Sequence, residues 1–356
     1  MQDIKELFDP VRLGAFNMHN RIVMSPMTRS RAGKGDCPTA LHAEYYGQRA
    51  DAGLIVTEGV QPSAAGKGYC RTPGLYSPEQ IDGWGRVAEA VHDRGGKIVV
   101  QLMHCGRIAA RINKDDESDI VAPSAITANW KIFTDTSGLV DMDAPRALET
   151  DEVAQVVDEY RQAAVNARAA GLDGVELHAS SGYLPMQFLS TNTNKRSDQY
   201  GGNVKNRVRF SIEVLTAMGE AIGFDRVGLR TSPGLGFNDI DDADPAETYG
   251  ELFDQASTLG LAYLHLVRNK TPKIDNYALT RERWKGALIL NGNLTAPKAA
   301  SILQSGGADA VSFGRDFIGN PDLVERLRRG VELSDYDQDR VYTEGPEGFT
   351  DYPVAT

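Results

Sequence analysis

The sequence predicts an α/β fold, namely a single (β/α)8 (TIM) barrel with loop insertions that cap the C-terminal face of the barrel. Short β-rich runs alternate with amphipathic stretches, and eight such runs occur along the chain. A barrel of this kind needs about 250 residues, and the chain has 356. A doubly wound sheet is the structural alternative. It would require a GxGxxG motif directly after a strand, with an acidic residue about 20 positions later, and no such combination occurs.

Each predicted strand is a short run rich in Val, Ile and Leu. In chain order the eight runs are 21–25, 53–59, 97–102, 174–178, 226–230, 262–267, 287–292 and 308–314. Amphipathic stretches at 79–95, 150–171 and 244–260 predict helices between some of them. Each stretch ends in glycine, which commonly ends a helix, and Pro245 lies in the first turn of the third, where proline is tolerated.

The chain beyond a minimal barrel follows particular strands. Residues 103–149 come after the third strand, 231–244 after the fifth and 267–280 after the sixth. These are βα connections, which open onto the face where the active sites of barrel enzymes lie. We therefore expect one domain over residues 1–356, with 103–149 as a capping insertion. The tail 344–356 lacks helical periodicity and is expected to fold back over the site.

Composition argues against several classes of protein. A net charge of −11 offers no basic face for nucleic acid. Cys37, Cys70 and Cys105 are well separated, which argues against a disulfide scaffold or a structural metal site. The polar N-terminus has no signal-peptide character, and no apolar run approaches the roughly 20 residues of a membrane span. These observations predict a cytoplasmic protein without a metal that binds neither nucleic acid nor membrane.

Polar side chains meet where three strands end. Because side chains alternate along a strand, Glu176 and His178 should point into the barrel on the fourth strand. The same count turns Arg230 inward on the fifth strand and Gln101 on the third. A lone strand-end histidine is usually structural, and a lone arginine can simply pair with a carboxylate such as Glu176. The convergence of an imidazole, a guanidinium and an amide on one rim favours a functional site.

Glycines follow the last two strands. Gly292 and Asn293 come after the seventh strand, and Gly314 and Arg315 come after the eighth, each pair before a helix-like stretch. Loops after these two strands form the usual phosphate site of barrel enzymes, because backbone N–H groups and the helix dipole favour an anion. One glycine after a strand is only a turn residue. Both together favour a phosphorylated ligand.

Five longer motifs carry a resemblance to a known family. They are SPMTRSRA (25–32), GYCRTPGLYSPEQIDGW (68–84), QLMHCGR (101–107), LHASSGYLPMQFLSTNTNKRSDQYGG (177–202) and FGRDFIGNPDL (313–323). In order and position they resemble the Old Yellow Enzyme family of FMN-dependent ene reductases, in the branch of the N-ethylmaleimide and 12-oxophytodienoate reductases. The resemblance extends from about Phe8 to the closing GFTDYP.

The resemblance implies a non-covalent FMN and assigns residues to it. Arg230 would lie beside N1 and O2 of the flavin, where its charge stabilises the anionic reduced ring. Thr28 would lie near O4, and Gln101 would bind the pyrimidine edge. The implied cofactor residues are Pro26, Met27, Thr28, Gly59, Gln101, His178, Arg230, Gly292, Asn293, Gly314 and Arg315.

The resemblance also implies catalytic roles for His178, Tyr183, Ser181 and Thr28, and a substrate contact for Tyr69. His178 would donate a hydrogen bond to the carbonyl oxygen of the substrate as hydride arrives. Tyr183 would protonate the α-carbon on the face opposite the flavin, which a phenol can do for a strongly basic enolate. Ser181 stands where the family usually has histidine or asparagine. Its shorter side chain leaves open direct contact or a bridging water.

The predicted activity is NADPH- or NADH-dependent reduction of activated alkenes such as enones, enals, maleimides and nitroalkenes. Two alternatives remain. A sugar-phosphate aldolase or isomerase would want a Schiff-base lysine or an acid–base pair at strand ends, whereas Lys97 begins its strand and Lys270 lies in a loop. The other is a non-catalytic flavin-binding protein.

Met103 and Phe349 replace the family's usual tryptophan and tyrosine and are expected to alter the pocket. The protein is expected to be a monomer or a homodimer.

Overall fold

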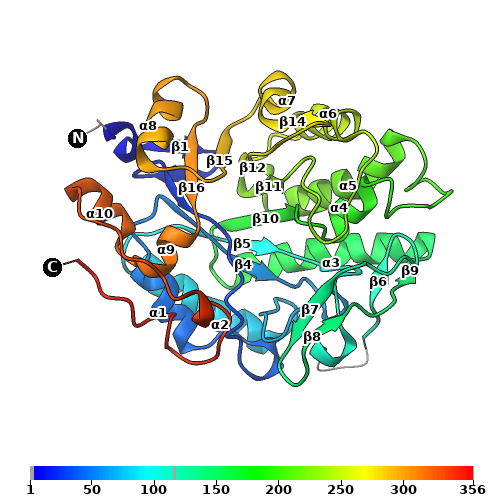
Figure 1. Ribbon diagram of the computed structural model, residues 1–356, viewed down its shortest axis with the longest axis horizontal. Helices are drawn as coiled ribbons and strands as arrows, with labels where there is room; N and C mark the ends of the chain where they lie inside the picture. Colours follow the sequence, from blue (N-terminus) through cyan, green and yellow to red (C-terminus); the bar gives the residue numbers. More distant parts are fainter. Residues whose placement is uncertain (1–3, 115–117, 356) are drawn as a thin grey trace.

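Eight parallel strands close into a barrel, with helices around them (Figure 1). The computed structural model describes residues 4–114 and 118–355. The barrel strands are β3 (Ile22–Met24), β4 (Leu54–Val60), β5 (Ile98–Leu102), β10 (Gly174–Ala179), β11 (Val227–Thr231), β12 (Tyr263–Val267), β15 (Leu288–Asn291) and β16 (Ala310–Phe313). Each overlaps one predicted run, and β16 pairs with β3 to close the barrel. The predicted (β/α)8 architecture is confirmed.

The helices end where local sequence signals predict. They are α1 (Ala40–Gln48), α2 (Pro78–His92), α3 (Thr150–Ala169), α4 (Leu184–Leu189), α5 (Val204–Ile222), α6 (Pro245–Ala256), α7 (Asn276–Arg283), α8 (Ala296–Gln304), α9 (Arg315–Gly319) and α10 (Leu323–Arg329). Ser77 caps α2 by accepting a hydrogen bond from the backbone of Gln80, and Asp244 caps α6 just before Pro245. The three helices predicted from amphipathic patterns are confirmed. Within the described ranges, no helix has the length and apolar character that a bilayer-spanning segment requires.

Smaller elements fill the remaining connections. Antiparallel hairpins are β1 (Val11–Leu13) with β2 (Phe16–Met18), β7 (Lys131–Thr134) with β8 (Gly138–Asp141), and β13 (Lys270–Thr271) with β14 (Ile274–Asp275), and β6 (Val121–Ala122) pairs in parallel with β9 (Arg146–Ala147). Short 3₁₀ helices are Lys5–Phe8, Lys34–Asp36, Ala64–Gly66, Arg111–Asn113, Phe224–Arg226 and Gln338–Arg340. These elements lie in the connections between the barrel strands and helices and in the two terminal segments, so they vary the barrel's ends without altering its sheet.

The alternation of side chains gives each barrel strand two faces. Val175 and Leu177 of β10 belong to the apolar cluster that packs against the helices. Inward residues at the N-terminal end of the barrel form a second apolar cluster, to which the β1–β2 hairpin contributes Phe16. Glu176 and His178 lie on the opposite face of β10 from the helix-facing pair, as predicted, and are buried. The interior is therefore apolar at one end and polar at the other.

The insertion at 103–149 packs over the polar end of the barrel. Its residues 115–117 lie outside the described part of the chain. On the inner face of the β7–β8 hairpin, Ile132 and Val140 pack in one apolar cluster with Tyr183. The opposite face of the hairpin is exposed. The cap therefore supplies an apolar roof above the end of β10.

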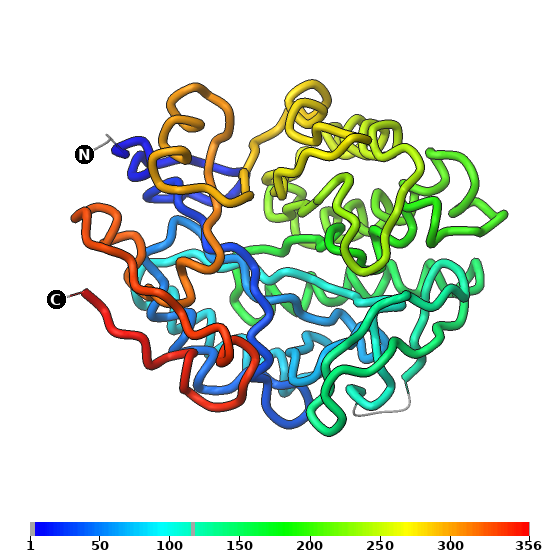
Figure 2. The backbone as a smooth tube through the Cα atoms, in the orientation of Figure 1, coloured from blue at the N-terminus to red at the C-terminus, as the bar shows by residue number. Residues whose placement is uncertain are grey.

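The C-terminal tail returns across the barrel beside α1, as the red stretch in Figure 2 shows. Arg31 donates hydrogen bonds to tail backbone carbonyls, and Arg29 donates to the carbonyl of Gly348 at 2.6 Å. Phe349 is fully buried and stacks on Tyr45 with 4.1 Å between ring centroids. The Arg31 guanidinium lies 4.6 Å from the Phe349 ring centroid. The stretch 344–356 does fold back, and Phe349 anchors it against α1. The tail residues that line a cavity beside Thr28 and Arg315 precede this stretch, at 336–342, so the expectation that 344–356 covers the site is not borne out.

We predict that Phe349→Ala lowers the free energy of unfolding by about 3–5 kcal/mol, because a buried ring between Tyr45 and two guanidinium groups is lost. Urea unfolding measures this change. Phe133→Ala, which removes a half-exposed ring from the outer face of β7, serves as the control and should cost about 1 kcal/mol or less. Equal losses in the two variants would contradict the anchoring role of Phe349.

Candidate active site

Neighbouring cavities open at the polar end of the barrel. The first, of about 160 Å³, is lined by Pro26, Met27, Thr28, Gly59, Gln101, Met103, His178, Ser181, Tyr183 and Arg230. The second, of about 350 Å³, is lined by Ser25, Pro26, Met27, Arg230, Asn291, Asn293, Leu294, Ser312, Phe313, Gly314, Arg315 and Asp316. They share Pro26, Met27 and Arg230. A third, of about 400 Å³, places Thr28 and Arg315 beside the tail residue Tyr342.

The structure brings the predicted site residues together with two qualifications. Gly292 does not line the second cavity, although its neighbours Asn291 and Asn293 do. Its φ of 137° instead turns the chain after β15, in a conformation that favours glycine. Tyr69 lies behind Tyr183 and accepts a hydrogen bond of 3.2 Å from its hydroxyl. Neither residue lines any of these three cavities: Gly292 shapes the loop after β15, and Tyr69 orients the Tyr183 hydroxyl.

A hydrogen-bond network forms the floor of the first cavity. Gln101 Nε2 donates to Glu176 Oε1 at 2.8 Å, and His265 Nδ1 lies 2.8 Å from Glu176 Oε2. The other ring nitrogen of His265, Nε2, lies 2.8 Å from Ser312 Oγ and 2.6 Å from Arg230 Nη1. These side chains come from β5, β10, β11, β12 and β16, so the closed barrel assembles the floor.

Two groups of this floor differ from the expectation. The alternative interpretation of Arg230, that it simply pairs with a carboxylate such as Glu176, is not borne out. Among the described residues no ion pair joins them, and the Arg230 guanidinium contacts His265. His265 was missed altogether. The alternation that turns Glu176 inward also turns Tyr263 and His265 of β12 inward, so the strand pattern does contain a signal for His265.

Burial sets the charges of the floor. Burial, aided by the Arg230 charge, lowers the pKa of His265 to about 4, so its ring is neutral near pH 7. Burial opposes ionisation of Glu176, but His265, Arg230 and Gln101 outweigh it and hold the pKa of this carboxyl below its usual value. A neutral imidazole carries one N–H. Beside a carboxylate that proton lies on Nδ1, which leaves the lone pair of Nε2 to accept from Ser312.

His178 and Tyr183 are in edge-to-face contact in the wall of the first cavity. Their ring centroids are 4.8 Å apart and their planes are nearly perpendicular. Burial first, and then the Arg230 charge, lower the pKa of His178 to about 3, so the ring is a neutral donor. Its Nδ1 is buried and has no hydrogen-bond partner among the described residues. Burial raises the pKa of Tyr183 well above its usual value, so the phenol keeps its proton.

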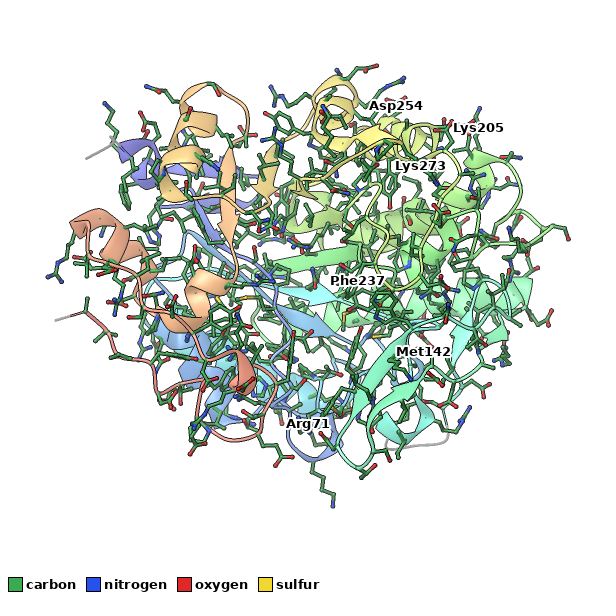
Figure 3. All side chains as sticks on the ribbon, viewed as in Figure 1. Arg71, Met142, Lys205, Phe237, Asp254 and Lys273 are labelled. Carbon is green, nitrogen blue, oxygen red and sulfur yellow. The ribbon has the colours of Figure 1, made fainter. Side chains whose placement is uncertain are left out.

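The turn between His178 and Tyr183 depends on its small residues. Gly182 has a φ of 81°, and a Cβ added there would lie 2.7 Å from Asn238 Cβ and 2.9 Å from the Phe237 carbonyl oxygen. Ser181 has a φ of 57°, and its carbonyl accepts a hydrogen bond of 2.8 Å from Asn238 Nδ2. Phe237, labelled in Figure 3, belongs to the loop after β11. That loop therefore holds the turn from above.

Gly59 and Met103 form a coupled pair at the rim. A Cβ added at Gly59 would lie 2.4 Å from Met103 Sδ, so the thioether occupies the space that a larger residue at 59 would fill. Met103 lines the first cavity, as expected for a position that shapes the pocket. Phe349 lies instead under the tail against Tyr45. Of the two departures from the family pattern, Met103 therefore shapes the first cavity, whereas Phe349 packs against α1 and does not line it.

The second cavity has the chemistry of an anion site. Within the described part of the chain the Arg315 side chain forms no hydrogen bond and no ion pair, and it is exposed at the cavity wall. Asn291 Nδ2 bonds to Ser25 Oγ at 2.9 Å and holds the loop after β15 against the loop after β3. An unpartnered guanidinium here, with the neutral His178 ring in the first cavity, fits a ligand that carries a phosphate at one end and hydrogen-bonding groups at the other.

Comparisons with known proteins agree with this geometry. The NADH:flavin oxidoreductase / NADH oxidase family matches residues 6–334. A probable flavin mononucleotide-dependent alkene reductase of Leishmania infantum is 39% identical over 99% of this chain and 98% of its own. The structure of morphinone reductase in complex with tetrahydroNAD is 44% identical, with a TM-score of 0.94 over 98% of each chain. An old yellow enzyme homologue from Zymomonas mobilis is 40% identical, with a TM-score of 0.94 over 98% of this chain and 99% of its own. The chain belongs to the NADH:flavin oxidoreductase / NADH oxidase family.

Proposed function

We propose that this protein is an FMN-dependent ene reductase that uses NADPH or NADH to reduce alkenes conjugated to a carbonyl, imide or nitro group. When bound, FMN accepts hydride from the nicotinamide and delivers it to the β-carbon of the alkene. The observation that carries the proposal is the pair of neutral donors, His178 and Tyr183, over a cavity whose floor holds Arg230 and Gln101. The alkene-reductase name of the Leishmania infantum relative supports the activity. The tetrahydroNAD complex of morphinone reductase supports the nicotinamide donor.

The chain offers a separate group for each part of the cofactor. Arg230 and Gln101 would meet the pyrimidine edge of the flavin, because both line the first cavity above Glu176. The Thr28 hydroxyl lines the same cavity and would meet O4. Arg315, with the loops at Asn293 and Gly314, would hold the phosphate. The two cavities share Arg230, so one ligand can extend through both.

His178 would bind and polarise the substrate. Its ring lines the first cavity, where a ring N–H would donate to a carbonyl or nitro oxygen. A neutral imidazole suits this role, because it stabilises developing negative charge and still keeps its own proton. Ser181 lines the same cavity and offers a second, shorter donor.

Tyr183 would donate the proton to the α-carbon. Its raised pKa makes it a weak acid, so transfer waits until hydride arrival makes the α-carbon strongly basic. The hydroxyl of Tyr69, bonded to that of Tyr183, fixes the direction of the phenol in the free site. Because the Tyr183 phenol is such a weak acid, the hydride is expected to arrive first and the proton second.

We further propose that residues 1–356 act as one FMN-binding domain located in the cytoplasm. Activated alkenes and nicotinamide are its small-molecule partners. NADPH and NADH both remain candidates as donor.

The aldolase alternative lacks support, because Lys97 lies at the opposite end of β5 from the cavity, before Ile98. The apolar roof of the cap favours alkenes that carry an apolar substituent.

The proposed function predicts that the protein purifies with non-covalent FMN, which chromatography of the chromophore released on denaturation identifies. Arg315→Ala should weaken FMN binding about 10–100-fold, because a charge-assisted hydrogen bond contributes about 1.5–3 kcal/mol. Lys205→Ala, which changes an exposed cation on α5, is the control and should bind FMN normally. Release of FAD, a covalent flavin, or no flavin after reconstitution would contradict the proposal.

Tyr183→Phe should slow alkene reduction about 100-fold or more, the usual contribution of a general acid, and leave reduction of the flavin by NADPH or NADH nearly unchanged. Stopped-flow absorbance separates the two half-reactions. Nitroalkenes should suffer less than enones, because a nitronate is stable enough to await a proton from solvent. Tyr160→Phe, a change in a buried tyrosine of α3, is the control. Equal slowing of both half-reactions would remove Tyr183 from the role of acid.

Ser181→Asn should tighten the binding of phenolic ligands by about 1 kcal/mol, because asparagine adds a longer neutral donor beside His178. The substitution suits the backbone, since asparagine adopts a positive φ more readily than serine does. Titration of a phenol into the oxidised enzyme measures the change, with Ser181→Ala as the control that gains no donor. His178→Ala should weaken the same ligands. Unchanged phenol binding in Ser181→Asn would show that this side chain is not directed at the ligand.

A further inference from the structure

We propose that His265 is a positioning residue that keeps Arg230 directed at the flavin and thereby sets the reduction potential of FMN. Through Glu176, His265 also fixes the amide of Gln101. The proposal rests on the FMN binding proposed above. His265 lies below the first cavity in β12, is fully buried and does not line the cavity itself. It acts on the cofactor through the residues it contacts.

The first step concerns the direction of each hydrogen bond. Glu176 Oε2 can only accept, so His265 Nδ1 donates to it. His265 Nε2 then carries the in-plane lone pair, which accepts from Ser312 Oγ at 2.8 Å. Arg230 Nη1 lies 2.6 Å from Nε2 and 3.0 Å from Nδ1, so the guanidinium contacts the face of the imidazole ring. Asn291 Nδ2 donates to the same Ser312 oxygen at 3.0 Å. Ser312 Oγ is therefore free to donate its own hydrogen to the imidazole. Every group in this row has one consistent role.

The second step concerns Arg230. Within the described residues its guanidinium bonds only to His265, and it lines both the first and the second cavity. His265 therefore anchors the guanidinium from below and leaves its other N–H groups for the cavity. The imidazole also separates Arg230 from Glu176. Without this spacer the two charges would attract each other directly, and the guanidinium would turn down toward the carboxylate.

The third step concerns Gln101. Its Nε2 donates to Glu176 Oε1, the oxygen that His265 does not occupy. Since His265 engages Oε2, the carboxylate cannot rotate without losing a buried hydrogen bond. One N–H and the carbonyl oxygen of the Gln101 amide therefore remain for a ligand. Both residues at the pyrimidine end of the site thus depend on the same imidazole.

The consequence for the cofactor is electrostatic. Reduced flavin is anionic, and the Arg230 charge favours it over the oxidised form. In His265→Leu, Arg230 can pair with Glu176 and the preference for reduced FMN should fall at least tenfold, which is about 30 mV for a two-electron couple. In Glu176→Gln the opposing charge is removed, and the preference should rise. The two changes act on neighbouring groups of one network with opposite expected signs.

The test measures the midpoint potential of bound FMN and the dissociation constants of its oxidised and reduced forms. The variants are His265→Leu, His265→Gln, Glu176→Gln and Arg230→Met. His265→Gln keeps one donor and one acceptor and should stay within about threefold of the wild-type preference, a smaller change than one lost hydrogen bond gives. His265→Leu combined with Arg230→Met should lower the potential no further than Arg230→Met alone, because the effect passes through Arg230. His104→Leu, which removes another fully buried neutral histidine away from the cavities, should leave the potential unchanged.

Several results would overturn the proposal. They are an unmoved potential in flavin-loaded His265→Leu, additive shifts in the double variant, or shifts of the same sign in His265→Leu and Glu176→Gln. If His265→Leu does not fold, Glu176→Gln decides, because an unchanged or lowered potential there also contradicts the charge argument. Absence of FMN from the wild-type protein would contradict the proposed function instead. The two failures can therefore be told apart.

Discussion

The buried carboxylate of Glu176 is the constraint around which the upper barrel is built. A charge with no exposure to water is costly unless it is paired and hydrogen-bonded. Its two oxygens are satisfied by Gln101 from one side and His265 from the other. Because these partners come from β5 and β12, on either side of β10, the carboxylate is satisfied only when β5, β10, β11 and β12 pair in the correct register. Fold and site are therefore stabilised by the same contacts.

Below this polar layer the barrel is filled by apolar side chains, and the boundary between the layers depends on small residues. Gly228 of β11 carries no side chain because the Tyr263 ring occupies that space, with its Cε2 only 2.3 Å from where a Cβ would lie. The ring in turn packs against Phe16 of the β1–β2 hairpin, 6.3 Å away between centroids. The polar floor thus rests on a packed support rather than on a water-filled channel.

The parts of this design that follow from local pattern could be predicted from the sequence. The eight strands and the inward direction of Glu176, His178, Arg230 and Gln101 depend on a period of two residues, which is visible along each strand. The stagger between strands decides which inward residues touch across the barrel, and the sequence of one strand does not reveal this stagger. For that reason the contact of Arg230 with His265, in place of the carboxylate, was not foreseen.

The attachment of the tail was also beyond local pattern. Arg31 bonds mainly to backbone carbonyls there, so no complementary side chains mark the contact in the sequence. This has a consequence for the order in which the protein is completed during synthesis. The tail from Val341 to Phe349 leaves the ribosome after all eight barrel strands. A nascent chain can therefore close its barrel and form the polar floor while the wall beside Thr28 and Arg315 is still missing, so the ligand-binding face is the last part to mature.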